Sequence, residues 1–198
     1  MHRLPDDHRT GGTILNDWSA LRDRVGHLDR DVTDGYRTAR RRQLDESTTV
    51  IAQRDPRELL DELASGWGLS WATIAKLVGV SSAAVRKWRR GESITGENRR
   101  AIARVVAFLD SAAQCLNPLS DAASWLEMPI SDDTQYTVAD VYHAGHVDIL
   151  LDLATQQIGP HALLDHFDPG WRSKKDSRFV VEQAADGMPG IFEVEETP

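Results

Sequence analysis

The first pattern along the chain is an apolar stripe that recurs at intervals of three and four. Its members are Trp18, Leu21, Val25, Leu28 and Val32. This spacing places them on one face of an amphipathic helix, because an α-helix turns once in about 3.6 residues. We expect the helix to begin near Asp17 and to fray near Gly35, after a loose polar terminus over residues 1–13.

Residues 55–116 predict four more helices from their start and stop signals. Asp55-Pro56 is a strong helix start, and Gly66 and Gly68 break the helix after Ser65. The other three are WATIAKLVG after Ser70, SAAVRKWRR after Ser81, and a long helix that opens at Thr95 or Gly96. The first of these three should end at Gly79 and the second at Gly91.

The last third also predicts short helices, followed by two strands. The helices are DAASWLEM after Ser120, VADVYHAG after Thr137, HVDILLDLATQQ after Gly145, and residues 161–167. The segment RFVVEQAADGMPGIFEVEE then predicts two short strands around an Asp186-Gly187 turn. We therefore expect a mainly α fold in three parts: residues 1–54, residues 55–117, and residues 118–198 with a β-hairpin as an option for the tail.

Composition narrows the class of protein. The chain has 198 residues, 40% hydrophobic and 27% charged, which is typical of a soluble globular protein of one or two domains. No run approaches the roughly 20 apolar residues that span a bilayer, and residues 1–12 lack the apolar stretch of a secretion signal. We expect a cytoplasmic protein. Its single cysteine, Cys115, excludes an internal disulfide and a Cys-rich zinc site, and we expect it to be buried.

Charge is divided unevenly along the chain. The net charge is −8, yet residues 59–117 hold eight Lys and Arg against five Asp and Glu. Residues 118–198 hold four against fifteen, and none of the four precedes Arg172. The basic residues crowd into 29 positions: Lys76, Arg86, Lys87, Arg89, Arg90, Arg99, Arg100 and Arg104. This basic island indicates one surface for polyanions, and the acidic region indicates a second surface with another purpose.

The middle of the basic island meets the demands of a helix-turn-helix. Such a motif needs a small residue where the helices meet, a residue that accepts a left-handed turn, and apolar residues that lock the second helix onto the first. Ala75 and Gly79 meet the first two demands. The apolar lock consists of Ile74, Val78, Val80, Val85 and Trp88. The alternative is a helix hairpin that only packs.

Residues 71–90, with Gly91, Glu92 and Ser93 after them, resemble the Xre-type helix-turn-helix of bacterial and phage repressors. The resemblance extends over about residues 56–113. The helix after Ser81 presents Ser82, Ala83, Arg86, Lys87 and Arg90 away from the apolar lock. Small residues allow close approach to bases, and Arg86 and Lys87 can donate to guanine. Phosphate contacts are expected from Arg89, Arg90, Arg99 and Arg100. We expect double-stranded DNA as the partner and a nucleoid-associated homodimer.

The segment Trp125-Leu126-Glu127-Met128-Pro129 and the helix pair TVADVYHAGHVDILLDLA resemble the toxin-binding domain of Xre-family antitoxins over about residues 121–158. That resemblance implies a toxin partner of the NAD-consuming RES class and a DNA site in the partners' own promoter. The first hypothesis is therefore an autoregulating antitoxin. A phage-type immunity repressor with a second DNA contact at WRSKKDSR, residues 171–178, is the alternative. A scaffold that binds only protein is the third.

Other candidate chemistry is weak. His143, His146, Asp148 and Asp140 could be imagined as metal ligands, but Gly145 interrupts the helix between the histidines, and surface or capping roles are favoured. No nucleophile or carboxylate pair has a catalytic setting, so we expect no enzyme, no metal and no cofactor. Of the six tryptophans, we expect Trp171 to be the exception to core packing.

Overall fold

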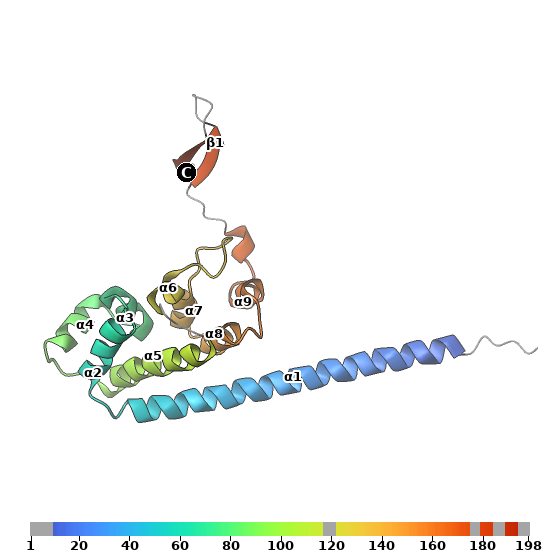
Figure 1. Ribbon diagram of the computed structural model, residues 1–198, viewed down its shortest axis with the longest axis horizontal. Coiled ribbons are helices and arrows are strands. Elements are labelled where there is room, and N and C mark those ends of the chain that lie inside the picture. The colour runs from blue at the N-terminus through green and yellow to red at the C-terminus, as the bar shows by residue number, and fades with distance from the viewer. Residues whose placement is uncertain (1–9, 117–121, 175–178, 184–188, 194–198) are drawn as a thin grey trace, which may run out of the picture. The chain divides into compact units, whose positions relative to one another are not determined.

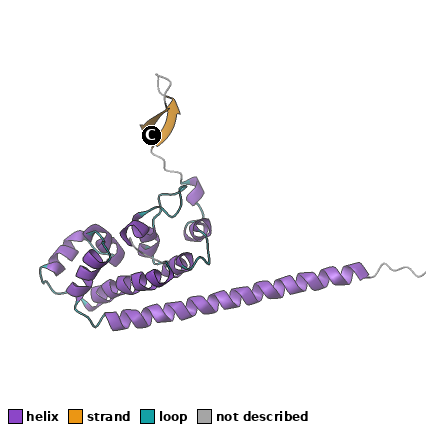
Figure 2. Cartoon of the chain, in the orientation of Figure 1, coloured by secondary structure: helices purple, strands orange, loops and turns teal. Residues whose placement is uncertain are grey.

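The protein is mainly helical (Figures 1 and 2). The computed structural model describes residues 10–116, 122–174, 179–183 and 189–193, and side chains at positions 21, 22, 24–27, 31–116 and 122–174. The chain divides into two compact units, residues 1–43 and residues 44–198. No described helix is long and apolar enough to cross a membrane.

The first described element is α1, Thr10–Ile51. The expectation that this helix would fray near Gly35 is wrong, because the helix continues for sixteen residues beyond that glycine. A glycine in a helix costs only about 1 kcal/mol relative to alanine. Good helix formers follow Gly35, and no neighbouring atom stands within 4 Å of where its Cβ would be. The helix therefore absorbs this cost.

Five helical segments follow in the second unit: α2 (Pro56–Asp61), the π-turn η1 (Glu62–Gly66), α3 (Trp71–Val78), α4 (Ser82–Arg89) and α5 (Gly96–Cys115). Four of the predicted starts are confirmed by cap hydrogen bonds, at Asp55, Ser70, Ser81 and Thr95. In each, a side-chain oxygen accepts a hydrogen bond from a backbone N–H of the first turn, which has no partner inside the helix. Thr95 and Gly96 were the two predicted start positions of α5, and Thr95 is the N-cap.

The helices after residue 121 are short: α6 (Ala122–Glu127), α7 (Val138–His143), α8 (Val147–Ala154), α9 (Pro160–Phe167) and the 3₁₀ turn η2 (Trp171–Ser173). Thr137 caps α7 as predicted, and the cap is reciprocal, because the Asp140 side chain accepts from the Thr137 backbone. The predicted cap Ser120 lies outside the described residues. Two strands, β1 (Phe179–Gln183) and β2 (Pro189–Glu193), pair antiparallel. The predicted Asp186-Gly187 turn lies outside the described residues.

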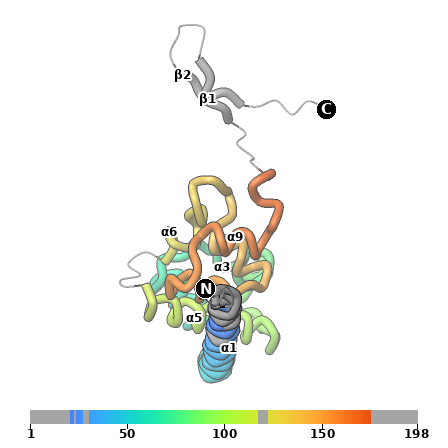
Figure 3. The backbone as a smooth tube through the Cα atoms, turned by 90° about the vertical axis from the view of Figure 1, so that its right-hand side faces the viewer, coloured from blue at the N-terminus to red at the C-terminus, as the bar shows by residue number. Residues whose placement is uncertain are grey.

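The core of the second unit is built around α5. In both Figure 1 and Figure 3, α5 lies along the lower edge of the second unit, and α3, α6 and α9 all lie above it. Phe108 is fully buried and packs against Trp125 and Tyr142, with ring centroids 5.9 and 4.9 Å away. One apolar cluster runs from Leu44 to Trp171. Helices on both sides of residues 117–121, which are not described, therefore share one core.

Two side chains differ from expectation. Cys115 is exposed rather than buried, because it is the last residue of α5 and lies beyond Ala112, the last buried residue of that helix. Trp171 is buried, with 4% of its surface exposed, so the expectation that it is an exception to core packing is wrong. Its indole Nε1 donates to Asp165 Oδ1 at 2.9 Å, and the His161 ring stacks on it. A satisfied N–H allows an indole ring to be buried at low cost.

Candidate nucleic-acid interface

Helices α3 and α4 are joined by a tight turn at Gly79. This residue has φ +79° and ψ 31°, the left-handed conformation that its position predicted. The Val80 N–H donates to the Ala75 carbonyl at 2.9 Å, which satisfies one of the carbonyls at the end of α3. Ser81 then begins α4 by accepting a hydrogen bond from the Ala84 N–H at 3.2 Å. Glycine and serine chemistry therefore sets the path of the chain between the two helices.

The apolar face of α4 packs into the unit. Val85 is fully buried and Trp88 is 6% exposed, while Ile74, Ala75 and Val78 of α3 are buried in the same core. Val80 in the turn is partly buried against this core. The predicted apolar lock is confirmed, and it leaves the opposite face of α4 to solvent.

The solvent face of α4 carries the residues that were predicted to project away from the apolar lock. Ser82, Ala83, Arg86, Lys87 and Arg90 are all exposed. Within the described part of the chain, no ion pair engages Arg86 or Lys87. Arg90 lies 3.6 Å from Glu92 in a pair that is exposed on both sides, which holds the guanidinium weakly. Two cations are thus available on this helix, next to two small side chains.

The other cations of the basic island have different surroundings. The Arg89 guanidinium lies over the Trp71 ring, 3.9 Å from its centroid. Lys76 pairs with Asp140 at 2.8 Å, and Arg104 pairs with Asp45 at 3.6 Å. Arg99 and Arg100 are exposed in the first turn of α5, and no described acidic side chain pairs with them. The cations that remain available therefore come from α4 and from the start of α5.

Sequence reasoning missed one cation at this surface. Arg57, in the first turn of α2, lies beside Gly91 at the end of α4. Gly91 has φ +99°, and a Cβ there would come within 2.6 Å of Arg57 Nη2. The glycine therefore provides both the left-handed backbone and the room for the guanidinium. No local signal marks this proximity, because it depends on how α2 packs against α4.

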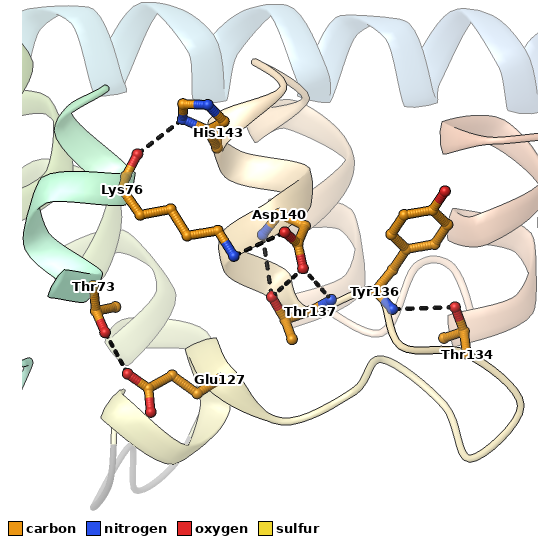
Figure 4. A network of polar contacts seen from close by, with 8 residues as sticks. All are labelled: Thr73, Lys76, Glu127, Thr134, Tyr136, Thr137, Asp140 and His143. Carbon is orange, nitrogen blue, oxygen red and sulfur yellow. Dashed lines mark hydrogen bonds and ion pairs between the residues drawn. The ribbon is translucent and has the colours of Figure 1, made fainter. Parts of the chain in front are cut away.

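Polar side chains of α3 contact the C-terminal helices (Figure 4). Thr73 donates a hydrogen bond to the Glu127 carboxylate, and Lys76 Nζ pairs with Asp140. His143 Nδ1 is hydrogen-bonded to the Lys76 backbone oxygen at 2.8 Å. Partial burial would raise the pKa of Asp140, but hydrogen bonds from Lys76 and Thr137 outweigh it and hold that pKa below its ordinary value.

The two described cations near the C-terminus are also paired. Arg172 forms a two-pronged hydrogen bond with the Asp165 carboxylate, and Lys174 Nζ lies 2.8 Å from Asp168 Oδ2. The hydrogen bonds from Arg172 and Trp171 lower the pKa of Asp165. Lys175 and residues 176–178 of the predicted second DNA contact lie outside the described residues. Neither described cation of that segment is available without breaking a pair.

The imagined metal ligands do not come together. Asp140 caps α7, His143 bonds to α3, and His146 packs edge-on against Phe167 with centroids 5.5 Å apart. In the described residues, no three His, Cys, Asp or Glu side chains are grouped as a metal site requires.

Comparison with known proteins adds nothing to these observations: no family model, curated protein or solved structure matches the chain.

Proposed function

We propose that this chain is a sequence-specific DNA-binding transcriptional repressor, with α3 and α4 as its helix-turn-helix and α4 as the recognition helix. One observation carries the proposal. The exposed face of α4 places Ser82 and Ala83 in its first turn and the available cations Arg86 and Lys87 in the next. Small residues let a helix approach base edges in the major groove, and cations one turn later reach guanine N7 and O6.

Phosphate contacts would come from the cations around this helix. Arg99 and Arg100 at the start of α5, Arg90 at the end of α4 and Arg57 beside Gly91 are exposed. Arg89 is partly committed to the Trp71 ring but keeps its charge. Such contacts orient a protein on the duplex and supply affinity without specificity. The repressor role rests on the resemblance of residues 56–113 to Xre-type repressors.

The test is a selection of bound sequences from a randomised duplex library with the full chain, followed by titration of the selected duplex. Arg86→Ala/Lys87→Ala should lose about 1–3 kcal/mol of discrimination for each base contact removed. Arg99→Ala/Arg100→Ala should instead weaken binding to all sequences and reduce the slope of log affinity against log salt by about 0.9 for each lost contact.

The matched control removes two positive charges elsewhere. Arg172→Ala/Lys174→Ala should leave affinity and salt slope near those of the wild type, since both side chains pair with carboxylates. A steep loss in this control would favour the immunity repressor with its second DNA contact. Unchanged specificity in a folded Arg86→Ala/Lys87→Ala variant would contradict the recognition-helix assignment.

The antitoxin role rests on the resemblance of residues 121–158 and stays a prediction. The motif residues Trp125 and Leu126 pack in the shared core, whereas Met128 is 62% exposed. Met128→Asp would therefore probe a docking surface without disturbing the core. Co-expression with a RES-class toxin tests it: rescue of growth by the wild type and not by Met128→Asp supports neutralisation, and absence of rescue by the wild type contradicts it.

A further inference from the structure

The described side chains of the apolar stripe in the first unit are exposed. Leu21, Val25 and Val32 are 50%, 63% and 54% exposed. Among the described side chains, the first buried one is Leu44, which belongs to the second unit. Single exposed apolar residues are common on proteins, but a row of them along one helix face marks an interaction surface.

The spacing of the stripe fits a seven-residue repeat. With Trp18 at position a, Leu21 takes d, Val25 a, Leu28 d and Val32 a, and Ile14 before them is also at d. On a straight helix, a strict seven-residue stripe would rotate around the helix axis by about 20° per heptad. Such a stripe stays in contact with a partner helix only when the two helices wind around each other in a supercoil. The repeat ends where Gly35 and then Arg42 take d positions. The seam therefore covers residues 14–32.

The positions that flank the seam carry complementary charges. Asp17 and Arg24 occupy g positions, and Arg22 and Asp29 occupy the e positions five residues after them. In a parallel pair of helices, a g residue faces the e residue of the next heptad on the other helix. Asp17 then faces Arg22 of the partner copy, and Arg24 faces Asp29 of the partner copy. The stripe is thus complementary to itself, which selects a second copy of this chain as its occupant.

We propose that residues 14–32 of α1 form a parallel, two-stranded coiled coil with the same residues of a second copy of this chain. Valine at a combined with leucine at d favours two strands, and the central heptads have this combination. Association buries the exposed seam, which gives the long α1 helix the tertiary support that a single exposed helix lacks. The inference does not depend on DNA binding, so each proposal can fail while the other holds.

Sedimentation equilibrium of the full chain tests the association. The wild type should show twice the mass of one 22.1 kDa chain. Val25→Asp/Val32→Asp places charges at two a positions and should reduce the mass to that of one chain. The matched control, Gly26→Asp/Thr33→Asp, places the same charges one residue later, outside the seam, and should keep the doubled mass.

Three results would overturn the proposal: a wild type of single-chain mass, a doubled mass in the Val25→Asp/Val32→Asp variant, or dissociation of the control. A thermal transition unchanged from that of the wild type would show that the second unit stays folded in each variant. Retained single-site DNA binding in the monomeric variant would separate the two proposals.

Cross-linking tests the parallel orientation. Cys115 is exposed and is first replaced, as Cys115→Ser, so that it cannot compete. In a parallel pair, Val25 faces its own copy, and Val25→Cys in that background should form a covalent dimer on oxidation. An antiparallel pair over residues 14–32 would place Val25 opposite Leu21. A covalent dimer that forms only in the Leu21→Cys/Val25→Cys variant would therefore overturn the orientation.

Discussion

The apolar stripes on α1 and α5 have the same residue spacing, but the stripe on α1 is exposed and the stripe on α5 is buried. Val25 and Val32 of α1 are more than half exposed, whereas Val105, Val106 and Phe108 of α5 are fully buried. Both helices carry apolar residues at intervals of three and four. The difference is that the helices α2, α3 and α8 pack against α5. The periodicity therefore predicts that one face of a helix packs against another surface, but it does not predict whether that surface belongs to the same chain or to another molecule.

The largest expected effect comes from truncating the buried stripe. Phe108→Ala should destabilise the second unit by about 3–5 kcal/mol, because it removes a fully buried ring that two other aromatic rings contact. Chemical denaturation followed by tryptophan fluorescence measures the loss. The matched change in the exposed stripe, Leu21→Ala, should alter this transition by less than about 0.5 kcal/mol. Equal losses in the two variants would show that the stripes are not in different environments.

A smaller effect should come from Gly35 in the exposed helix. Gly35→Ala should stabilise α1 by about 0.5–1 kcal/mol, since the glycine is helical and an added Cβ meets no neighbour within 4 Å. Far-UV circular dichroism should show helical signal retained to higher temperature, while the main transition of the second unit stays in place. A decrease in helical signal would mean that α1 bends or ends at this residue.

The smallest effect concerns the ion pair between Lys76 of α3 and Asp140 of α7. The pKa of Asp140 lies below its ordinary value of 3.8, so the pair stabilises the fold above that value and loses its effect as the pH falls through the folded pKa. Because both side chains are more than one-third exposed, the contribution should be less than about 0.5 kcal/mol. Apolar packing rather than this ion pair should hold the C-terminal helices in place.

Denaturation at several pH values checks the pair. The difference in free energy of unfolding between wild type and Asp140→Asn should be constant above about pH 5 and should vanish as the pH falls below 3.8. The exposed Asp132 provides the control, and Asp132→Asn should follow the wild type throughout. A difference that grows toward low pH would contradict the assigned sign.

Local chemistry was predictable from the sequence. The caps at Asp55, Ser70, Ser81 and Thr95 and the left-handed turn at Gly79 follow from hydrogen bonds and backbone sterics within a few residues. The apolar face of α4 followed from its period, and with it the exposure of the opposite face. The fraying at Gly35 failed as a prediction because one glycine does not outweigh the helix formers around it.

Contacts between distant residues were decided only by the tertiary structure. Lys76, Arg86 and Lys87 are equivalent as cations in the sequence, but α7 brings Asp140 to Lys76 and no described acid to the other two. The same holds for Arg57 beside Gly91 and for the burial of Trp171. Each depends on how helices far apart in the chain pack together. A pattern of residue types specifies which side chains need a partner, and only the packing of the elements determines which of them have one within the chain.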